Sequence, residues 1–221
     1  MLADWKLRRA RLIVKWGAEL HRLRIPFTGK VVLPLNVKGL EKSLAEVHDV
    51  FARHGIRFWL RDGTALGVVR DGGIIARDDD VDLGIWPEEL PALEHALRDL
   101  EAIGFVVYKH NRWIIGLLKR WETIEIVVSG SWEQDDGYHN FVDGFFENLK
   151  SVGYLGRQFN VPADSDAYLE FCYGPDWRTP KPFSWWASST WLPHEEREEY
   201  RMRFIAGRDE ASSASREPGQ T

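Results

Sequence analysis

Apolar residues recur every three or four positions in several segments of the chain. In the first of these segments they are Leu40, Leu44, Val47 and Phe51. A period near 3.6 residues places such side chains on one face of a helix. The helices predicted from this spacing cover residues 39–54, 87–103 and 164–173.

Shorter runs of apolar and β-branched residues, bounded by turn residues, predict strands. The predicted strands cover residues 56–60, 81–86, 105–108, 113–118, 123–128, 138–146 and 152–161. Helices and strands alternate along the first half of the chain, and further strands follow. This order predicts an α+β (mixed α/β) fold in which helices pack on a short sheet.

One predicted strand begins inside a cluster of acidic residues. Four aspartates, Asp78, Asp79, Asp80 and Asp82, occupy five positions just before and inside strand 81–86. Because side chains alternate along a strand, Asp80 and Asp82 point to one face and their apolar neighbours point to the core. Carboxylates this close repel one another, and a hard divalent cation is their usual counter-charge. A solvated acidic turn is the alternative, which the apolar strand around the aspartates disfavours.

A glycine and a threonine precede the acidic cluster. Gly63 and Thr64 lie between a predicted turn at residues 61–62 and a helical run over residues 65–70. Backbone N–H groups and a hydroxyl at a helix N-terminus bind phosphate readily, and the planar guanidinium of Arg70 could bind it as well. The alternative is that the pair only caps the helix.

The spacing of these residues resembles the LicD/fukutin branch of the nucleotidyltransferase superfamily. That family's motif runs GT-x-LG-x-x-R-x-x-G-x-I-x-x-D-D-D-x-D. It is matched here by Gly63, Thr64, Leu66, Gly67, Arg70, Gly73, Ile75, Asp78, Asp79, Asp80 and Asp82. A second, less specific block follows at Gly156, Val161-Pro162, Tyr168-Leu169 and Tyr173 to Trp177. The resemblance covers roughly residues 40 to 185 and implies a nucleotidyltransferase-like short mixed sheet with helices packed on it.

The resemblance also implies a phosphotransferase that uses Mg2+ or Mn2+. Such enzymes take a CDP-activated alcohol, for example CDP-choline or CDP-ribitol, and pass its phospho-alcohol to a glycan or glycolipid hydroxyl with release of CMP. Modification of cell-surface glycans is the process implied. Asp80 and Asp82 would hold the metal. Glu125, on predicted strand 123–128, would complete the metal site or accept the proton of the attacking hydroxyl.

Gly63, Thr64 and Arg70 would bind the phosphate groups of the donor. The family often has Pro-Trp directly before its aspartates, whereas this chain has Ala76-Arg77. Arg77 brings a positive charge beside the carboxylates, which makes it a further candidate for phosphate binding. Asp78 is a further candidate metal ligand.

Two other functions fit the same motif. The chain could transfer a nucleotide, such as AMP from ATP, to a small molecule or a protein. It could also be a non-catalytic module that binds a nucleotide or a glycan, although such a module would gain from losing the carboxylate repulsion. The tryptophans near the second block either pack on the fold or form an aromatic cage for choline; they are Trp177, Trp185, Trp186 and Trp191.

Composition limits the size and the partners of the protein. At 221 residues and 44% hydrophobic content, the chain fits one domain with appendages. Residues 1–30 carry a formal charge of +6 and the remainder carries −11, so the acidic body disfavours nucleic acid as a partner. The single cysteine, Cys172, excludes an intrachain disulfide and fits a reducing compartment.

We expect three parts along the chain. They are a basic amphipathic helix or extension at 1–35, a catalytic domain at 36–192, and a charged helix with a disordered tail at 193–221. No apolar stretch reaches the ~18 residues that span a bilayer and no signal peptide is evident, which favours the cytoplasm. Residues 1–30 place Trp and Leu among bases at helical spacing. This pattern fits either docking on protein or peripheral contact with the inner face of the membrane.

Overall fold

The fold was analysed in a computed structural model, which describes residues 37–76, 78, 80–130, 142–180, 199 and 202. The expected N-terminal helix, the polar segment after Gly130, most of the C-terminal part, and residues Arg77 and Asp79 lie outside the described residues. Within the described residues, no helix is long and apolar enough to cross a membrane.

A mixed five-stranded sheet forms the centre of the fold. Its strand order is β1-β2-β5-β4-β3. The strands are β1 (Trp59–Leu60), β2 (Asp80–Ile85), β3 (Val106–His110), β4 (Ile114–Lys119) and β5 (Glu122–Val128). β2 and β5 run parallel, and the other neighbouring strands pair antiparallel. The structure therefore confirms the predicted α+β (mixed α/β) fold with a short mixed sheet.

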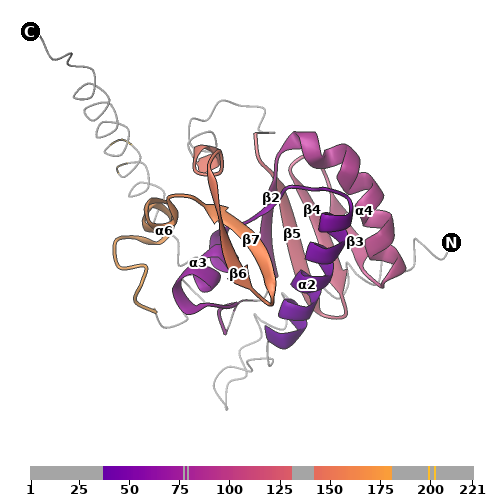
Figure 1. Cartoon of the computed structure of the whole chain (residues 1–221), viewed down its shortest axis with the longest axis horizontal. Coiled ribbons are helices and arrows are strands. Elements are labelled where there is room, and N and C mark those ends of the chain that lie inside the picture. The colour runs from indigo at the N-terminus through magenta and orange to yellow at the C-terminus, as the bar shows by residue number, and fades with distance from the viewer. Residues whose placement is uncertain are drawn as a thin grey trace, which may run out of the picture.

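Two long helices cover the sheet (Figure 1). α2 (Val37–Arg53) packs against α4 (Leu90–Ala102) and against β2 and β5, while α4 also contacts β3. A short 3-10 turn, η1 (Pro87–Glu89), leads into α4. The helix predicted at 39–54 is confirmed, and the one predicted at 87–103 is confirmed with this turn as its start. Along β5 buried and half-buried residues alternate, so one face of the sheet enters the core and the other stays accessible.

A second, smaller sheet extends the molecule beyond β1. The hairpin of β6 (Leu149–Tyr154) and β7 (Arg157–Pro162) contacts β1 through β7. It is followed by α6 (Ser165–Tyr173), which begins where the carboxylate of Asp164 accepts a hydrogen bond from the N–H of Ala167. Figure 1 shows the hairpin, α3 and α6 together at the left of the molecule.

Three predicted strands differ from the structure. The strand expected at 56–60 is reduced to Trp59–Leu60. Residues 142–144 are helical, so the strand expected at 138–146 is wrong where it is described. The strand expected at 152–161 is a hairpin that turns at Leu155 and Gly156. Their φ angles of 52° and 69° are those of a tight hairpin turn. Leucine seldom adopts a positive φ, so the sequence did not predict a turn at this position.

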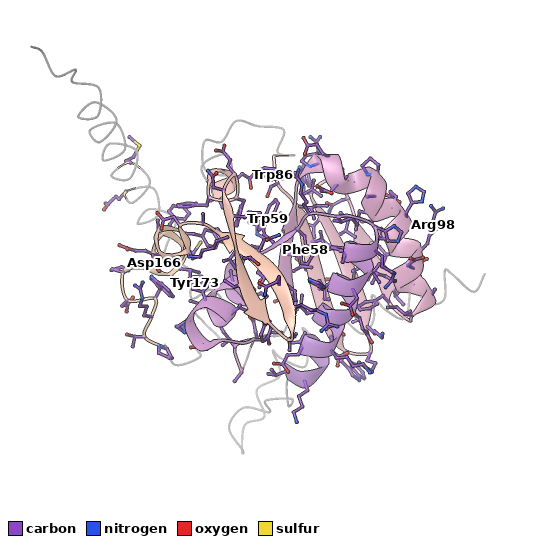
Figure 2. The ribbon with its side chains drawn as sticks, in the orientation of Figure 1. Phe58, Trp59, Trp86, Arg98, Asp166 and Tyr173 are labelled. Atoms are coloured by element: carbon purple, nitrogen blue, oxygen red, sulfur yellow. The ribbon has the colours of Figure 1, made fainter. Side chains whose placement is uncertain are left out.

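Aromatic side chains fill the space between β1 and the elements around it. The indole of Trp59 stacks on Phe146 at 5.1 Å and lies 5.2 Å from Trp86, between ring centroids. Trp59 and Trp86 are labelled in Figure 2. A Cβ at Gly84 would lie 2.2 Å from Nε1 of Trp59, so only glycine fits on β2 at this point. This packing holds β1 against β2, close to the acidic residues.

Candidate active site

The register of β2 and β5 brings the predicted carboxylates together. Asp82 on β2 is paired with Glu125 on β5, and Asp80 is paired with Thr123. Side chains of paired residues share a face of a sheet, so all three carboxylates lie on the accessible face. Val81 and Leu83 are fully buried on the other face, as the alternation predicted.

α3 (Asp62–Asp71) contacts β2 and begins earlier than the sequence predicted. Gly63 and Thr64 are in its first turn, not in front of it. The hydroxyl of Thr64 is buried and accepts a hydrogen bond of 2.9 Å from the N–H of Asp82. Thr64 thus ties the first turn of α3 to the strand that carries the aspartates, and its binding of phosphate stays a prediction.

Gly63 allows a third aspartate to approach the same turn. A Cβ at Gly63 would lie 2.7 Å from Oδ2 of Asp78, so the carboxylate occupies the space that a side chain would need. The N–H of Asp78 donates to the carbonyl of Ile75 at 2.9 Å, which closes the loop before β2. Glycine in the Gly-Thr pair is therefore a steric requirement for placing Asp78.

The aspartates form a region of strong negative charge. Asp82 is half-buried, and desolvation of its carboxyl raises its pKa well above the ordinary value of 3.8. The charges of Asp80, Asp62 and Asp78 raise this pKa further, while Arg61 opposes the shift. An ionised Asp82 is therefore costly unless a cation is close by.

A buried network at the start of α3 was missed by the sequence analysis. Nε of Arg61 donates to Asp62 at 2.8 Å, and the Arg61 side chain is only 9% exposed. The hydroxyl of Tyr168 on α6 donates to Oδ1 of Asp62 at 2.8 Å and accepts from the Asp62 N–H at 2.9 Å. The network holds Asp62 at a φ of 47°, a left-handed conformation that few non-glycine residues adopt. The sequence predicted only a turn at residues 61–62.

Two residues of β3 contact Glu125. The hydroxyl of Tyr108 donates to Oε1 of Glu125 at 3.0 Å, and Nζ of Lys109 lies 3.6 Å from the same oxygen. Burial raises the pKa of Tyr108 far above its ordinary value of 10.0, and the charge of Glu125 adds to the shift. Tyr108 therefore stays protonated and remains a hydrogen-bond donor to the carboxylate.

The part of the chain that carries these carboxylates is similar to a known protein family. Residues 55–126 match the family LicD, described as LicD/FKTN/FKRP, nucleotidyltransferase domain. Residues 55–126 are thus similar to the nucleotidyltransferase domain of this family, and they are called the LicD-type domain below. The match begins before β1 and ends within β5, so Gly63, Asp80, Asp82 and Glu125 all lie inside the LicD-type domain.

Relatives extend the similarity beyond the LicD-type domain. An uncharacterized protein of Rickettsia typhi is 34% identical over 185 residues, which are 80% of this chain and 52% of that protein. The ribitol 5-phosphate transferase FKRP of Mus musculus is 27% identical over 168 residues, which are 67% of this chain and 34% of that protein. The Homo sapiens protein of the same name is 27% identical over 161 residues, or 64% of this chain and 32% of that protein. The chain thus spans about half or less of the length of these relatives.

Two solved structures show low similarity to this fold. ANT(2'')-Ia is 14% identical with a TM-score of 0.48, over 81% of this chain and 98% of that one. The lincosamide antibiotic adenylyltransferase LnuA is 16% identical with a TM-score of 0.41, over 56% of this chain and 80% of that one. At these TM-scores the likeness adds nothing to the assignment.

Of the two arginines predicted to bind phosphate, only Arg70 is among the described residues. Arg70 of the LicD-type domain donates to both carboxylate oxygens of Asp71, at 2.9 and 2.7 Å, and to the carbonyl of Trp177 at 3.3 Å. It joins the end of α3 to the segment after α6. Arg77 lies outside the described residues. Phosphate binding by either arginine stays a prediction.

The carboxylates of the LicD-type domain suit a hard divalent cation. Among the described residues, no three Asp, Glu, His or Cys side chains already surround one point as metal ligands. Mg2+ in phosphate-transferring enzymes typically uses one or two protein carboxylates and completes its shell with water and substrate phosphates. Asp80 and Asp82 can supply those carboxylates, and the crowded negative charge around Asp82 is what such an ion would offset.

Proposed function

We propose that this protein is a metal-dependent transferase that moves a phospho-alcohol from a CDP-activated donor to a glycan hydroxyl and releases CMP. The observation that carries the proposal is the pairing of Asp82 with Glu125, with Asp80 on the same face, inside a LicD-type domain. The similarity to ribitol 5-phosphate transferases supports a polyol phosphate, such as ribitol phosphate, as the transferred group. A phosphocholine donor is the alternative within the same reaction.

In the proposed reaction, the acceptor oxygen forms a bond to the phosphorus that carries the alcohol. The bond from that phosphorus to the CMP oxygen breaks, and CMP leaves with the electron pair. The acceptor hydroxyl would lose its proton to the Glu125 carboxylate, which lies on the same face as the aspartates, or to solvent if Glu125 instead completes the metal site.

The other residues of the proposed site bind and orient the donor. Asp80 and Asp82 would hold Mg2+ or Mn2+, which when bound neutralises charge on the diphosphate. The first turn of α3, which includes Gly63, would bind the diphosphate through its backbone N–H groups. Thr64 keeps that turn in register with Asp82 through its hydrogen bond.

The carboxylates provide the direct test. Asp80→Asn and Asp82→Asn should each reduce CMP release by at least about 100-fold, because each removes a charge that the metal requires. Asp99→Asn is the matched control, since Asp99 is half exposed on α4 and pairs with His54. Release of CMP is measured with CDP-ribitol and CDP-choline as donors and Mg2+ present. Turnover of the two variants within tenfold of the wild type would contradict the assignment.

The same assay separates the other functions. Pyrophosphate released from a nucleoside triphosphate, with no CMP released from CDP-alcohols, would indicate nucleotide transfer instead. If no metal-dependent thermal stabilisation appeared with any CDP-alcohol or nucleoside triphosphate, a non-catalytic binding module would be favoured.

A further inference from the structure

An irregularity in the edge strand β3 places two side chains toward Glu125. Val107 pairs with Leu117 and Lys109 pairs with Gly116, so Tyr108 is an extra residue without a counterpart on β4. Such a β-bulge changes the direction of the side chains around it. Successive residues of a regular strand point to opposite faces, yet here both Tyr108 and Lys109 contact the same oxygen of Glu125.

A glycine on the intervening strand lets these side chains cross the sheet. Lys109, Gly116, Glu125 and Asp82 are paired in turn across β3, β4, β5 and β2, so they form one row. Gly116 contributes no side chain to the row. A Cβ at Gly116 would lie 2.6 Å from Cζ of Tyr108, so the tyrosine ring lies where that side chain would be.

The two contacts are directed at one oxygen of the carboxylate. The hydroxyl of Tyr108 lies 3.0 Å and Nζ of Lys109 lies 3.6 Å from Oε1 of Glu125. Both donors approach from the β3 side, whereas Asp82 lies on the opposite side of β5. An acidic side chain held at one oxygen keeps a defined orientation and presents its second oxygen elsewhere.

We propose that Tyr108 is a positioning residue for Glu125, supported by Lys109 and made possible by the bulge in β3 and by Gly116. The proposal rests on the proposed function, in which Glu125 uses its other oxygen, Oε2, for the metal ion or the acceptor proton. Tyr108 itself contacts neither metal nor substrate. It acts by limiting the rotation of the Glu125 side chain.

The experiment compares two tyrosine-to-phenylalanine variants of the full chain. Tyr108→Phe keeps the ring over Gly116 and removes only the hydroxyl. Tyr154→Phe is the matched control, because the Tyr154 hydroxyl donates to Glu41 at 2.8 Å and accepts from the N–H of Ile74 at 3.2 Å, and neither partner is a carboxylate of the proposed site. Mn2+ affinity is measured by calorimetry with CDP as the probe. The kcat and the donor KM are measured for CMP release.

The proposal expects Tyr108→Phe to lose about 10–100-fold in Mn2+ affinity, or the same factor in kcat at a donor KM within about threefold of the wild type. The first result would show Glu125 acting on the metal and the second would show it acting on the acceptor; both support a positioning role. Tyr154→Phe should stay within about threefold of the wild type in both Mn2+ affinity and kcat. Circular dichroism confirms that each variant is folded.

A second variant tests the geometry independently. Gly116→Ala adds a methyl group where the Tyr108 ring lies and should reproduce the loss, while Gly144→Ala has open space around it and should not. If Tyr108→Phe keeps wild-type Mn2+ affinity, kcat and KM, the positioning role is overturned and the proposed function stands. If the wild type itself neither binds Mn2+ with CDP nor releases CMP, both proposals are overturned.

Discussion

Asp82 is half-buried and near the charges of Asp80, Asp62 and Asp78, with Arg61 as the opposing positive charge. Burial and these carboxylates raise its pKa, so the folded chain binds a proton at Asp82 more tightly than the unfolded chain does. The stability that Asp82 contributes is therefore complete below its ordinary pKa of 3.8 and is lost as the pH rises through the raised pKa. A bound divalent cation reverses this penalty by favouring the charged form.

An ionised Asp82 lowers the free energy of unfolding when no metal is bound. Without metal, Asp82→Asn should raise the unfolding temperature, because the amide keeps the shape of the side chain and removes the half-buried negative charge. A gain of about 1 kcal/mol corresponds to about 2–4 °C for a chain of this size. Thermal unfolding is followed in the presence of a chelator at pH 7.5 and at pH 4.5, and the gain should be larger at pH 7.5.

With metal bound, we expect the order of stability of the wild type and Asp82→Asn to reverse. Mg2+ with CDP should stabilise the wild type, by about 2.7 kcal/mol at a hundredfold excess over Kd, and should leave Asp82→Asn unchanged. A variant that unfolds at a lower temperature than the wild type without metal would show that Asp82 is not destabilising in the fold.

At the scale of elements, a bidentate ion pair joins the β6–β7 hairpin to α2. Nε and Nη2 of Arg157 on β7 donate to the two oxygens of Asp49 on α2, at 2.7 and 2.6 Å. Next to this pair, Nε2 of His48 lies 3.1 Å from the carbonyl of Gln158. Hydrogen bonds from Arg157 lower the pKa of Asp49 to about 2, so the pair persists far into the acid range.

This anchor predicts a defined pH dependence. A lowered folded pKa means that Asp49 contributes stability that is complete above its ordinary pKa of 3.8 and is lost as the pH falls toward 2. Asp49→Asn should therefore be less stable than the wild type at pH 6 and similar to it near pH 2. The Asp49 side chain is half exposed, so the difference should be no more than about 1 kcal/mol.

Urea unfolding at a series of pH values measures that difference. Asp166→Asn is a suitable control, because Asp166 pairs with Arg178 on the surface and joins no separate elements. A wild-type advantage that stayed constant from pH 6 to pH 2 would argue against the ion pair as its source.

At the scale of the whole molecule, the LicD-type domain depends on segments that follow it in the chain. Tyr168 of α6 holds the start of α3 through Asp62, and the carbonyl of Trp177 accepts a hydrogen bond from Arg70 at its end. Trp177 is itself buried, which supports a packing role for this tryptophan over a place in a choline cage. The other three tryptophans of that cluster lie outside the described residues.

The basic N-terminal segment is a candidate for contact with anionic membranes. Residues 1–30 carry eight Lys or Arg among tryptophans and leucines at helical spacing. If they contact anionic membranes, the full chain should co-sediment with phosphatidylserine-containing vesicles and a chain that lacks residues 1–30 should not. Binding should weaken with added salt, because charge contributes to it. Equal sedimentation of both proteins, each shown to be folded, would remove the membrane contact.

Elements with clear periodicity were predictable at every scale. Leu40, Leu44 and Val47 predicted α2, and the alternation through Val81 and Leu83 predicted which face of β2 carries Asp80 and Asp82. The short strand β1 and the β6–β7 hairpin were not predicted correctly. Their bounds are set by pairing partners and by a turn at Leu155, for which the local sequence holds no strong signal.

The sequence by itself determined the main helices, most strands and the acidic face, because these depend on local spacing along one segment. Only the tertiary structure decided which other side chains complete that face. Tyr108 comes from β3 and Tyr168 from α6, and they reach the site through a bulge and through the packing of a distant helix. Such contacts join residues far apart in the chain, so no local pattern encodes them.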